Sequence, residues 1–448
     1  MKKKFLSMAL IGAMVLSLAA CGGSGSSSSS DTSSDAGEST DTSSSSSGDA
    51  LQVVIWDTNQ QAGLQEICDD FTAETGIEAK VEVKDWDSYW TLLESGASGG
   101  SLPDVFWMHS NNSQMYMKND MLLQLDDYID ASDTIDLDNY MDEITELYTM
   151  DGKHYAVPKD YDTIALWYNK TMFDEAGLSY PDDSWSWDDL LEAAKALTKD
   201  DGSQYGFAFN PSNDQDTYYN WVYANDGYIV NDDHSASGYD DAKTLEAMDF
   251  TSDLLQYCPP STTMSETGTD VLFESGQVAM ITQGSWMINS FYTAENHDDY
   301  YWALLPYADV NGNGTCDSGE RYSAYNGLGW AASAKVKDPE SCYSLIAYLC
   351  GEEGQKLQSE KGVTMGGMKG VSDTFANAFE GMDVSAFIKA EEFSLYFRPY
   401  TRNTTVWEDA LQQKGAFLDP WQNPEDPALM STACDNAQKI IEDAIAKE

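Results

Sequence analysis

A twelve-residue stretch in the second half of the chain carries oxygen-bearing side chains at a calcium-binding spacing. Residues 309–320 read DVNGNGTCDSGE, with a glycine at the sixth position, where such loops turn sharply. The spacing predicts six metal ligands: Asp309, Asn311, Asn313, the backbone carbonyl of Thr315, Asp317 and Glu320. No amphipathic helix pair flanks the stretch, so a bound Ca²⁺ would hold the loop rather than act as a sensor. A cluster of Asx–Gly turns without metal is the alternative.

The chain begins with the features of an exported, lipid-anchored protein. Three lysines, residues 2–4, precede an apolar run from Phe5 to Ala20 that is too short to span a bilayer well. The run ends in Leu-Ala-Ala-Cys, which resembles the lipobox of bacterial lipoproteins. We therefore expect residues 1–20 to be removed and Cys21 to carry lipid such as palmitate. Residues 21–49 are nearly all Ser, Gly, Thr and Asp, which predicts a flexible tether.

The charge of the chain limits the kinds of partner it can have. The formal net charge is -52, and the chain has only three arginines. Such an acidic protein is unsuited to nucleic acid and disfavours anionic ligands, so a neutral ligand is expected. Six cysteines besides Cys21 are scattered without a C-x-x-C pair, which argues against a zinc ribbon or redox motif. Free thiols and one or two disulfides are both compatible with this spacing.

Hydrophobic periodicity predicts an α/β fold. A strand over residues 51–56 precedes a helix with Leu64, Ile67, Cys68 and Phe71 on one face, which Gly76 is placed to end. Alternating apolar residues from Ile77 to Val83 predict a second strand, and residues 104–108 a third. This βαβ opening indicates a mainly parallel sheet. Further along, the pattern predicts a capped helix from Ser186, strands at 205–209, 278–282 and 303–305, and mostly helix over the last 120 residues.

Aromatic residues beside polar loops indicate a sugar site. The chain has 13 tryptophans and 26 tyrosines. Sugars present apolar C–H faces ringed by hydroxyls, so their sites need aromatic planes together with Asp, Asn, Glu and Gln. The segments DVFWMHSNN, PKDYDTIALWYNK, YYNWVYAND and TQGSW supply this mixture. Each segment alone is explained by packing of an aromatic residue beside a loop, whereas together they favour a ligand cleft.

The order of several motifs resembles that of the extracellular solute-binding proteins of carbohydrate ABC importers, the class that includes maltodextrin-binding proteins. The motifs are VIWD, FTAETGIEAKVE, LPDVFWMH, YAVPKDYDTIALWYNKTMFDEAGL with SWSWDDL, FESGQVAMITQGSW, and LLPY with GLGWAAS. The resemblance covers roughly residues 50–445 and implies a two-lobed, periplasmic-binding-protein-like fold of type II that closes on a sugar. It implies a first lobe of residues 51–158 plus 303–334, a second lobe of 159–302 plus 335–448, and a hinge at residues 157–164.

The resemblance also implies roles for individual residues. Trp107 would stack on the sugar from the first lobe, Trp286 and Trp407 from the second, and Asp162 would bind hydroxyls. Tyr219 and Trp221 match the region of another aromatic contact. The remaining candidates are Trp56, Asp57, His109, Asn111 and Trp330. After His109 the maltodextrin pattern has an Asp-Arg pair, which Ser110-Asn111 replaces here, so the resemblance supports the family more strongly than it supports maltodextrin as the ligand.

The expected protein is therefore a sugar receptor rather than an enzyme. It would be a monomer on the outer face of the cytoplasmic membrane, in a Gram-positive cell, delivering a neutral mono- or oligosaccharide to a membrane permease. No pair of carboxylates is singled out for glycoside hydrolysis, so no catalytic residue is assigned, and no cofactor is expected beyond a structural Ca²⁺. A receptor for a non-sugar solute, a surface glycoside hydrolase and an adhesion module are the alternatives.

Overall fold

A computed structural model describes residues 49–210, 214–393, 395–413 and 416–448. Every element described below belongs to one compact unit within residues 47–448. The predicted signal segment, Cys21 and the tether up to residue 48 lie outside the described residues. No helix in the described ranges is long and apolar enough to cross a membrane. All six cysteines in these ranges are free thiols, which answers the open question of disulfides.

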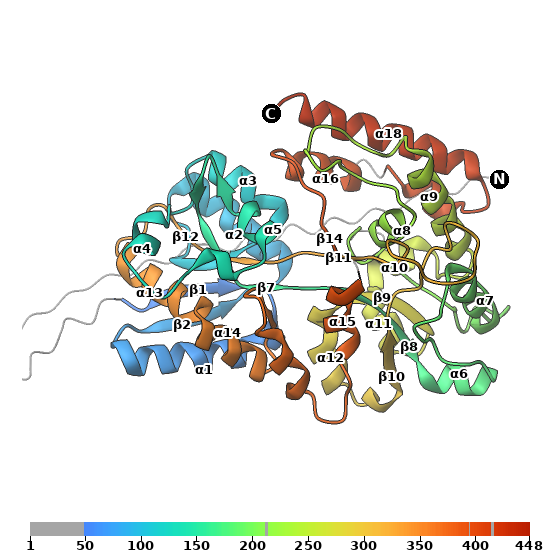
Figure 1. Ribbon diagram of the computed structural model, residues 1–448, viewed down its shortest axis with the longest axis horizontal. Coiled ribbons are helices and arrows are strands. Elements are labelled where there is room, and N and C mark those ends of the chain that lie inside the picture. The colour runs from blue at the N-terminus through green and yellow to red at the C-terminus, as the bar shows by residue number, and fades with distance from the viewer. Residues whose placement is uncertain (1–48, 211–213, 394, 414–415) are drawn as a thin grey trace, which may run out of the picture. The chain divides into compact units, whose positions relative to one another are not determined.

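The N-terminal half is built on a five-stranded sheet with the order β2-β1-β3-β12-β6. Its strands are β1 Leu51–Ile55, β2 Ala79–Val83, β3 Val105–Met108, β6 Ala156–Pro158 and β12 Gly329–Ala332. The first three strands are parallel, as the βαβ pattern predicts, whereas β12 runs antiparallel to both of its neighbours. We call this sheet and the helices packed on it the first lobe (Figure 1).

Helices cover both faces of this sheet, so its strands are apolar on both sides. One face, toward α1 Thr58–Thr75 and α13 Pro339–Cys350, carries Val53, Ile55, Val81, Trp107, Val157 and Trp330. The opposite face carries Val54, Phe106 and Met108 against α2 Trp86–Gly99 and α3 Ser110–Lys118. Helix α1 begins at its N-cap Asp57 and ends at Gly76, whose φ of 77° is the left-handed conformation that the sequence predicts for this glycine.

The lobe boundaries differ from those that the resemblance implies. Helix α13 and α14 Glu352–Glu360 pack on the first lobe, where Cys342, Leu345 and Leu349 share its core, although residues 335–448 are expected in the second lobe. Figure 1 shows these orange helices beside the blue α1. Conversely, the segment before β12 lies on the second lobe, because Tyr307 exchanges backbone hydrogen bonds with Trp185 and Trp187. The loop 309–320 is therefore attached to the second lobe and not to the first.

The second lobe is built on the antiparallel sheet β10-β8-β9. Its strands are β8 Ile164–Asn169, β9 Met280–Gly284 and β10 Tyr300–Ala303. Its helices are α6 Lys170–Ala176, α7 Trp187–Leu197, α8 Tyr218–Ala224, α9 Ala242–Leu255, α10 Ser261–Thr267, α11 Thr269–Glu274, α12 Ile288–Thr293, α15 Ser385–Phe393, α16 Thr404–Gln413, α17 Leu418–Gln422 and α18 Pro427–Ile445. The capping box of Ser186 and Asp189 is present. The strand predicted at 205–209 is wrong, because this segment forms only two isolated bridges, from Tyr205 to Val278 and from Ala208 to Ile281 of β9.

Short elements complete the described chain. They are α4 Asp126–Asp130, α5 Asp142–Leu147, β4 Thr149–Met150, β5 Lys153–His154, β7 Asp160–Tyr161, β11 Ser323–Tyr325, β13 Met365–Gly366 and β14 Leu395–Phe397. Four 3-10 turns span Leu137–Asn139, Ser285–Met287, His297–Asp299 and Ser372–Ala378.

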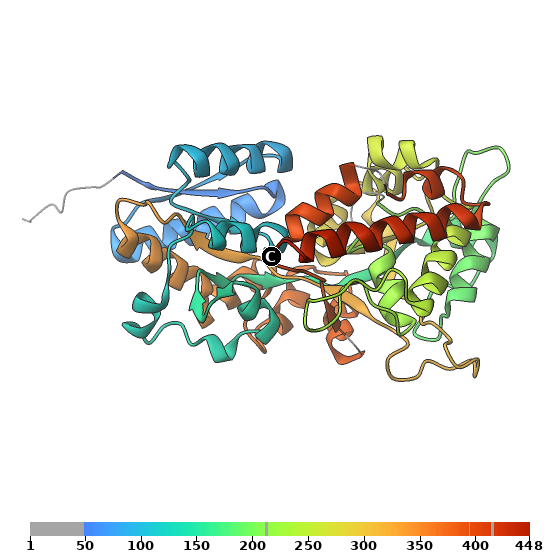
Figure 2. The same ribbon diagram turned by 90° about the horizontal axis from the view of Figure 1, so that it is seen from above.

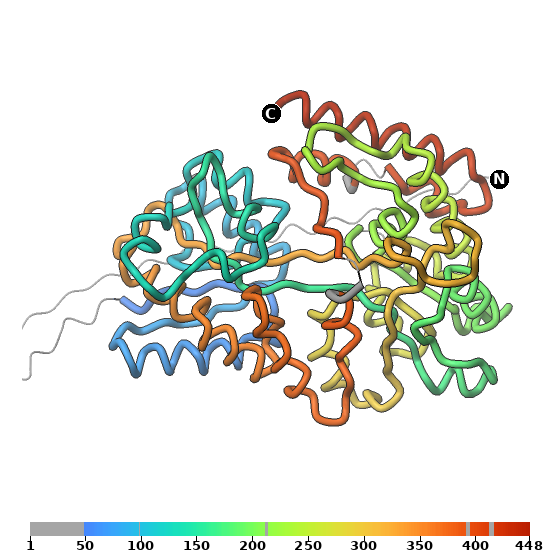
Figure 3. The backbone as a smooth tube through the Cα atoms, in the orientation of Figure 1, coloured from blue at the N-terminus to red at the C-terminus, as the bar shows by residue number. Residues whose placement is uncertain are grey.

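The chain crosses between the two sheets in segments that hydrogen-bond to one another (Figure 3). The first crossing follows β6, and the second leads into β12. Between them, the backbone N–H of Lys159 donates to Leu328 O at 2.7 Å and that of Asp162 to Asn326 O at 2.9 Å. A third segment, with β13 paired to β7, adds a bond from Gly367 N to Lys159 O. The connection is thus a hydrogen-bonded ribbon, not a set of independent linkers.

A buried ion pair lies inside this ribbon. Lys159 is fully buried, and its Nζ contacts the carboxylate of Asp160, donates to Gln60 Oε1 at 3.1 Å and lies 4.4 Å from the Trp107 ring centroid. The Asp160 carboxylate also accepts from Leu328 N at 2.8 Å and Thr364 Oγ1 at 3.0 Å. This pair therefore joins α1, β3 and all three crossing segments.

Removing the carboxylate of Asp160 should strongly destabilise the protein. Asp160→Ala leaves the Lys159 ammonium buried without its counter-charge, which costs about 3–5 kcal/mol in comparable cases. Urea denaturation at pH 7 measures this loss. Glu352→Ala, which breaks the exposed pair between Glu352 and Lys356, is the control and should change little. Equal stability of the two variants would contradict the role given to Asp160.

Candidate functional site

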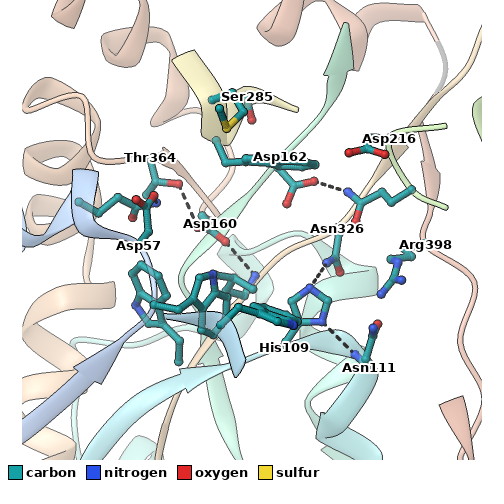
Figure 4. Close-up of a pocket in the computed structure, with 18 of the residues that line it drawn as sticks. Asp57, His109, Asn111, Asp160, Asp162, Asp216, Ser285, Asn326, Thr364 and Arg398 are labelled. Atoms are coloured by element: carbon teal, nitrogen blue, oxygen red, sulfur yellow. Dashed lines mark hydrogen bonds between the residues drawn. The ribbon is translucent and has the colours of Figure 1, made fainter. Parts of the chain in front are cut away.

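A cavity of about 1000 Å³ lies between the lobes and is lined by residues of both. This volume is at the top of the range for small-molecule sites, which is about 300–1,000 Å³. Figure 4 shows its polar centre, where Asp162, Asn326 and His109 come from the crossing segments and the end of β3. The cavity is therefore large enough for a ligand bigger than a single sugar ring.

A group of tryptophans forms the first-lobe wall of the cavity. Trp56 follows β1, Trp86 and Trp90 lie one turn apart on α2, and Trp107 is on β3. The Trp86 ring centroid lies 5.2 Å from that of Trp56 and 5.6 Å from that of Trp90. Rings at these distances touch, so no ligand fits between them, and the group is a platform rather than a cage. Trp86 is 44% exposed and offers its surface to the cavity.

Hydrogen-bonded polar groups form the centre of the cavity. The Asp162 carboxylate accepts from Gln215 Nε2 at 2.5 Å. His109 caps α3, with Nδ1 accepting from Asn111 N at 3.2 Å, and its Nε2 lies 3.4 Å from Asn326 Nδ2. Asn326 is almost fully buried, and its Oδ1 has no hydrogen-bond partner among the described residues. A hydroxyl group is the kind of donor that this oxygen lacks.

Burial sets the charge state of this polar centre. Burial lowers the pKa of His109 well below its usual range, and the positive charge of Arg398 lowers it further, so the imidazole is neutral at pH 7. Burial also raises the pKa of Asp162 well above its usual range, with the negative charge of Asp160 as the second cause. The centre therefore favours neutral, hydrogen-bonding forms of its groups.

The second lobe contributes a buried charge pair and a tryptophan. Arg398 Nη2 lies 2.7 Å from Glu408 Oε1, and both side chains are at most 5% exposed. The pair reaches the first lobe, where Arg398 Nη1 donates to Ser110 Oγ at 3.4 Å. Beside it, Thr405 Oγ1 donates to the backbone oxygen of Asn111 at 2.6 Å. This contact places α16 against α3, as the view from above shows (Figure 2).

Trp286 completes the lining from the second lobe. It follows β9 and is half-buried at the cavity. A Cβ atom on Gly284 would lie 2.0 Å from the Trp286 ring, so only glycine allows the ring to fold back over the backbone here. The GSW sequence thus fixes the position of this tryptophan.

Seven of the predicted ligand residues line the cavity. They are Trp56, Asp57, Trp107, His109, Asn111, Asp162 and Trp286. Trp107 is fully buried, so within this group the more exposed Trp56 and Trp286 are better placed for stacking. Asp57 caps α1 and accepts from Asn59 N and Gln60 Nε2, which orients its carboxylate at the rim.

Four other predicted residues do not line the cavity. Trp330 pairs with Trp107 across β12 and β3, so its side chain lies on the α1 face of the sheet and is buried there. Trp407 is buried in the second lobe, and its Nε1 donates to Thr401 Oγ1 at 3.2 Å. Tyr219 and Trp221 are buried on α8, where Trp221 packs against Phe250. Each of these four aromatic side chains therefore belongs to the protein core.

Several lining residues are absent from the sequence prediction. They are Trp86, Trp90, Gln215, Asn326, Arg398 and Glu408. The two tryptophans carry a signal in the sequence, because DWDSYW begins with a helix N-cap and places them four residues apart. Arg398 and Glu408 carry none, because only the path of the chain after α15 brings them to the cavity.

The predicted calcium loop lies apart from the cavity residues, and its predicted ligands are exposed except for Glu320, which is buried. Asp309 accepts from the backbone N–H groups of Asn313 and Gly314 at 2.9 and 3.0 Å. The amide nitrogens of Asn311 and Asn313 donate to Asp317 Oδ2 at 2.7 and 2.8 Å. Within the described ranges, no group of three or more His, Cys, Asp or Glu side chains is placed to hold a metal ion. The metal site stays a prediction.

A family model for bacterial extracellular solute-binding proteins matches residues 66–381. The chain belongs to this family. A binding protein of Brucella abortus is 24% identical over 56% of this chain and 61% of its own length, so the match spans less than two thirds of that relative. A maltooligosaccharide ABC transporter solute-binding lipoprotein of Streptococcus pneumoniae is 24% identical over 88% of each chain.

The fold of this solute-binding protein matches solved structures. An ABC substrate-binding protein of Listeria monocytogenes in complex with cycloalternan superposes with a TM-score of 0.75. The two are 19% identical, over 87% of this chain and 98% of the other. The two-lobed α/β fold implied by the motif order is therefore confirmed.

The ionised carboxylate of Asp162 should cost stability in the absence of ligand. Because its pKa is higher in the folded protein than in the unfolded chain, the folded state holds the proton more tightly, and stability falls as pH rises above about 4. Asp162→Asn removes this cost. The free energy of unfolding of the variant, relative to that of the wild type, should therefore be higher at pH 8 than at pH 4. Urea denaturation at both pH values measures the difference. The exposed Asp373→Asn is the control, and an equal difference at both pH values for Asp162→Asn would contradict the account.

Proposed function

We propose that this solute-binding protein captures a neutral oligosaccharide in the cavity between its lobes and delivers it to an ABC permease. The observation that carries the proposal is the pairing of an exposed tryptophan platform with a hydroxyl-binding polar centre in one cavity. Trp56 and Trp86 supply flat apolar surface, while Asp162, Asn326 and Glu408 supply hydrogen-bond acceptors. Sugar rings match both, because their C–H faces stack and their hydroxyls donate.

The size of the cavity and the known relatives support an oligosaccharide rather than a single ring. The cavity of about 1000 Å³ extends from the Trp86 platform in the first lobe to Trp286 in the second. The Streptococcus relative is named for maltooligosaccharides, and the Listeria structure holds cycloalternan. These names support glucose-based oligosaccharides as the first ligands to try.

The location that we propose follows from the N-terminal sequence. Lipid on Cys21 and the Ser-rich tether would hold the binding lobes as a monomer on the outer face of the cytoplasmic membrane, within reach of a permease. The same relative, a solute-binding lipoprotein of an ABC transporter, supports this arrangement.

Removing the platform should weaken oligosaccharide binding. Trp56→Ala and Trp86→Ala should each raise the Kd by about 30-fold, or about 2 kcal/mol, because each ring supplies stacking surface at the centre of the contact. Isothermal titration against maltotriose, maltotetraose, cycloalternan and galacto- and arabino-oligosaccharides measures the loss on whichever of these binds.

The control for this prediction is Tyr301→Ala. Tyr301 is also 44% exposed, but it lies on β10, away from the cavity. The Tyr301→Ala variant should bind the sugars with the same affinity as the wild type. Failure of the wild type to bind any member of the panel would overturn the proposed function, and parent-like affinity in both tryptophan variants would place the sugar elsewhere.

We also propose that the loop 309–320 takes one structural Ca²⁺. Its support is the sequence spacing and the clustering of Asn311 and Asn313 around Asp317, to which both amide groups donate. Ca²⁺ at 100 times its Kd should stabilise the wild type by about 2.7 kcal/mol, and EDTA should remove the effect. Asp309→Ala should abolish it, whereas Asp200→Ala in another exposed loop should not. A melting temperature that is independent of Ca²⁺ would contradict the site.

A further inference from the structure

The charge pair of Arg398 and Glu408 has unused hydrogen-bonding capacity beside the cavity. Glu408 is 3% exposed; its Oε1 is paired with Arg398 Nη2 at 2.7 Å, whereas its Oε2 has no hydrogen-bond partner among the described residues. Arg398 is 5% exposed, and its Nε–H is also without a partner. Both residues line the cavity. Buried polar atoms of this kind are rarely left unsatisfied, so they indicate groups that a ligand completes.

The missing partners define the chemistry of the ligand. Glu408 and the Oδ1 of Asn326 are acceptors and need donors, while the Arg398 Nε–H needs an acceptor. A hydroxyl group is both donor and acceptor. Two neighbouring hydroxyls of a sugar ring can thus satisfy Glu408 and Arg398 together, one by donating and the other by accepting. A carboxylate, sulfate or phosphate group offers no donor to Glu408.

The electrostatics of the cavity oppose an anionic ligand. Its described lining contains eight carboxylate side chains and a single guanidinium, which is already paired with Glu408. The ammonium of Lys159 is likewise held by Asp160, behind Trp107. An anion entering this cavity meets no free cation among the described residues, and such like-charge juxtaposition rejects a wrong ligand.

We propose that Arg398, Glu408 and Asn326 form a specificity subsite that binds neighbouring hydroxyls of a neutral sugar residue and rejects residues bearing an acidic group. This inference rests on the proposed function and adds the class of sugar to it. Glu408 acts in two ways at this subsite, because it accepts a hydroxyl hydrogen and it cancels the charge of Arg398. Arg398 also donates a hydrogen bond to Ser110 of the first lobe, so the subsite lies where a sugar can contact both lobes.

The test compares one neutral trisaccharide with its acidic analogue. The probe is maltotriose, or the neutral trisaccharide that binds best in its place, against the same trisaccharide oxidised to a carboxylate at C6 of a terminal residue. Titration calorimetry should show that the wild type binds the neutral form at least about 100-fold more tightly. Glu408→Gln keeps the shape of the side chain but frees the charge of Arg398, so the preference should fall to about 10-fold or less.

Three further variants separate this subsite from a general effect of charge. Asn326→Ala removes an acceptor without touching the pair, so affinity for both trisaccharides should fall together and their ratio should stay. Asp87→Asn removes one negative charge from the part of the lining that α2 of the first lobe contributes, and should change the ratio by less than about threefold. The exposed Glu425→Gln should change nothing. Circular dichroism checks the folding of each variant.

The possible results distinguish failure of the subsite from failure of the proposed function. Binding of the neutral trisaccharide with equal binding of its acidic analogue would overturn the subsite while leaving the proposed function intact. The same holds if Asp87→Asn and Glu408→Gln shift the ratio equally, or if Glu408→Gln folds and leaves the ratio unchanged. If Glu408→Gln does not fold, parent-like affinity of Asn326→Ala overturns the subsite. No binding of any neutral oligosaccharide would overturn the proposed function itself.

Discussion

The ion pair of Lys159 and Asp160 is the interaction on which the rest of the structure depends. It lies where the crossing segments meet, and its partners come from α1, β3 and the residues directly before β12 and β13. A buried ammonium must keep its counter-charge, so these elements can only pack in the arrangement that supplies it. That arrangement places the ends of β1 and β3, with Trp56 and His109, directly at the cavity. The binding site is thus a consequence of how the two sheets are joined.

The cavity combines groups that are unfavourable without a ligand. Asp162 and Glu408 both have raised pKa values because burial removes their hydration, and the pKa of Glu408 reaches about 7. Polar atoms of Asn326 and Arg398 lack hydrogen-bond partners within the part of the chain that the structure describes. Functional sites are commonly destabilising in this way, because the groups are arranged for the ligand rather than for the empty protein. Opposite walls come from different lobes, so a ligand that satisfies both also holds the lobes together.

Sequence periodicity predicted the elements well where local signals are strong. The helix that Gly76 ends, α1, and the capping box at Ser186 are specified by local residues, and the structure confirms both. The roles of individual aromatic residues are less predictable, because the sequence does not show which face of the sheet a tryptophan in a strand occupies. Trp107 and Trp330 lie on one face of the sheet, a fact set by the pairing of β3 with β12. Likewise, Arg398 and Glu408 reach the cavity only through long-range packing, which no local pattern records.

The central claim is that one ligand contacts both lobes across the cavity. Hydrogen–deuterium exchange of the protein, with and without a saturating oligosaccharide from the binding panel, tests it most directly. The account predicts ligand-dependent protection in both lobes, around residues 56–60 and 86–94 in the first and around 398–409 in the second, together with the crossing at 326–328. Protection confined to one lobe, or located away from these segments, would contradict it.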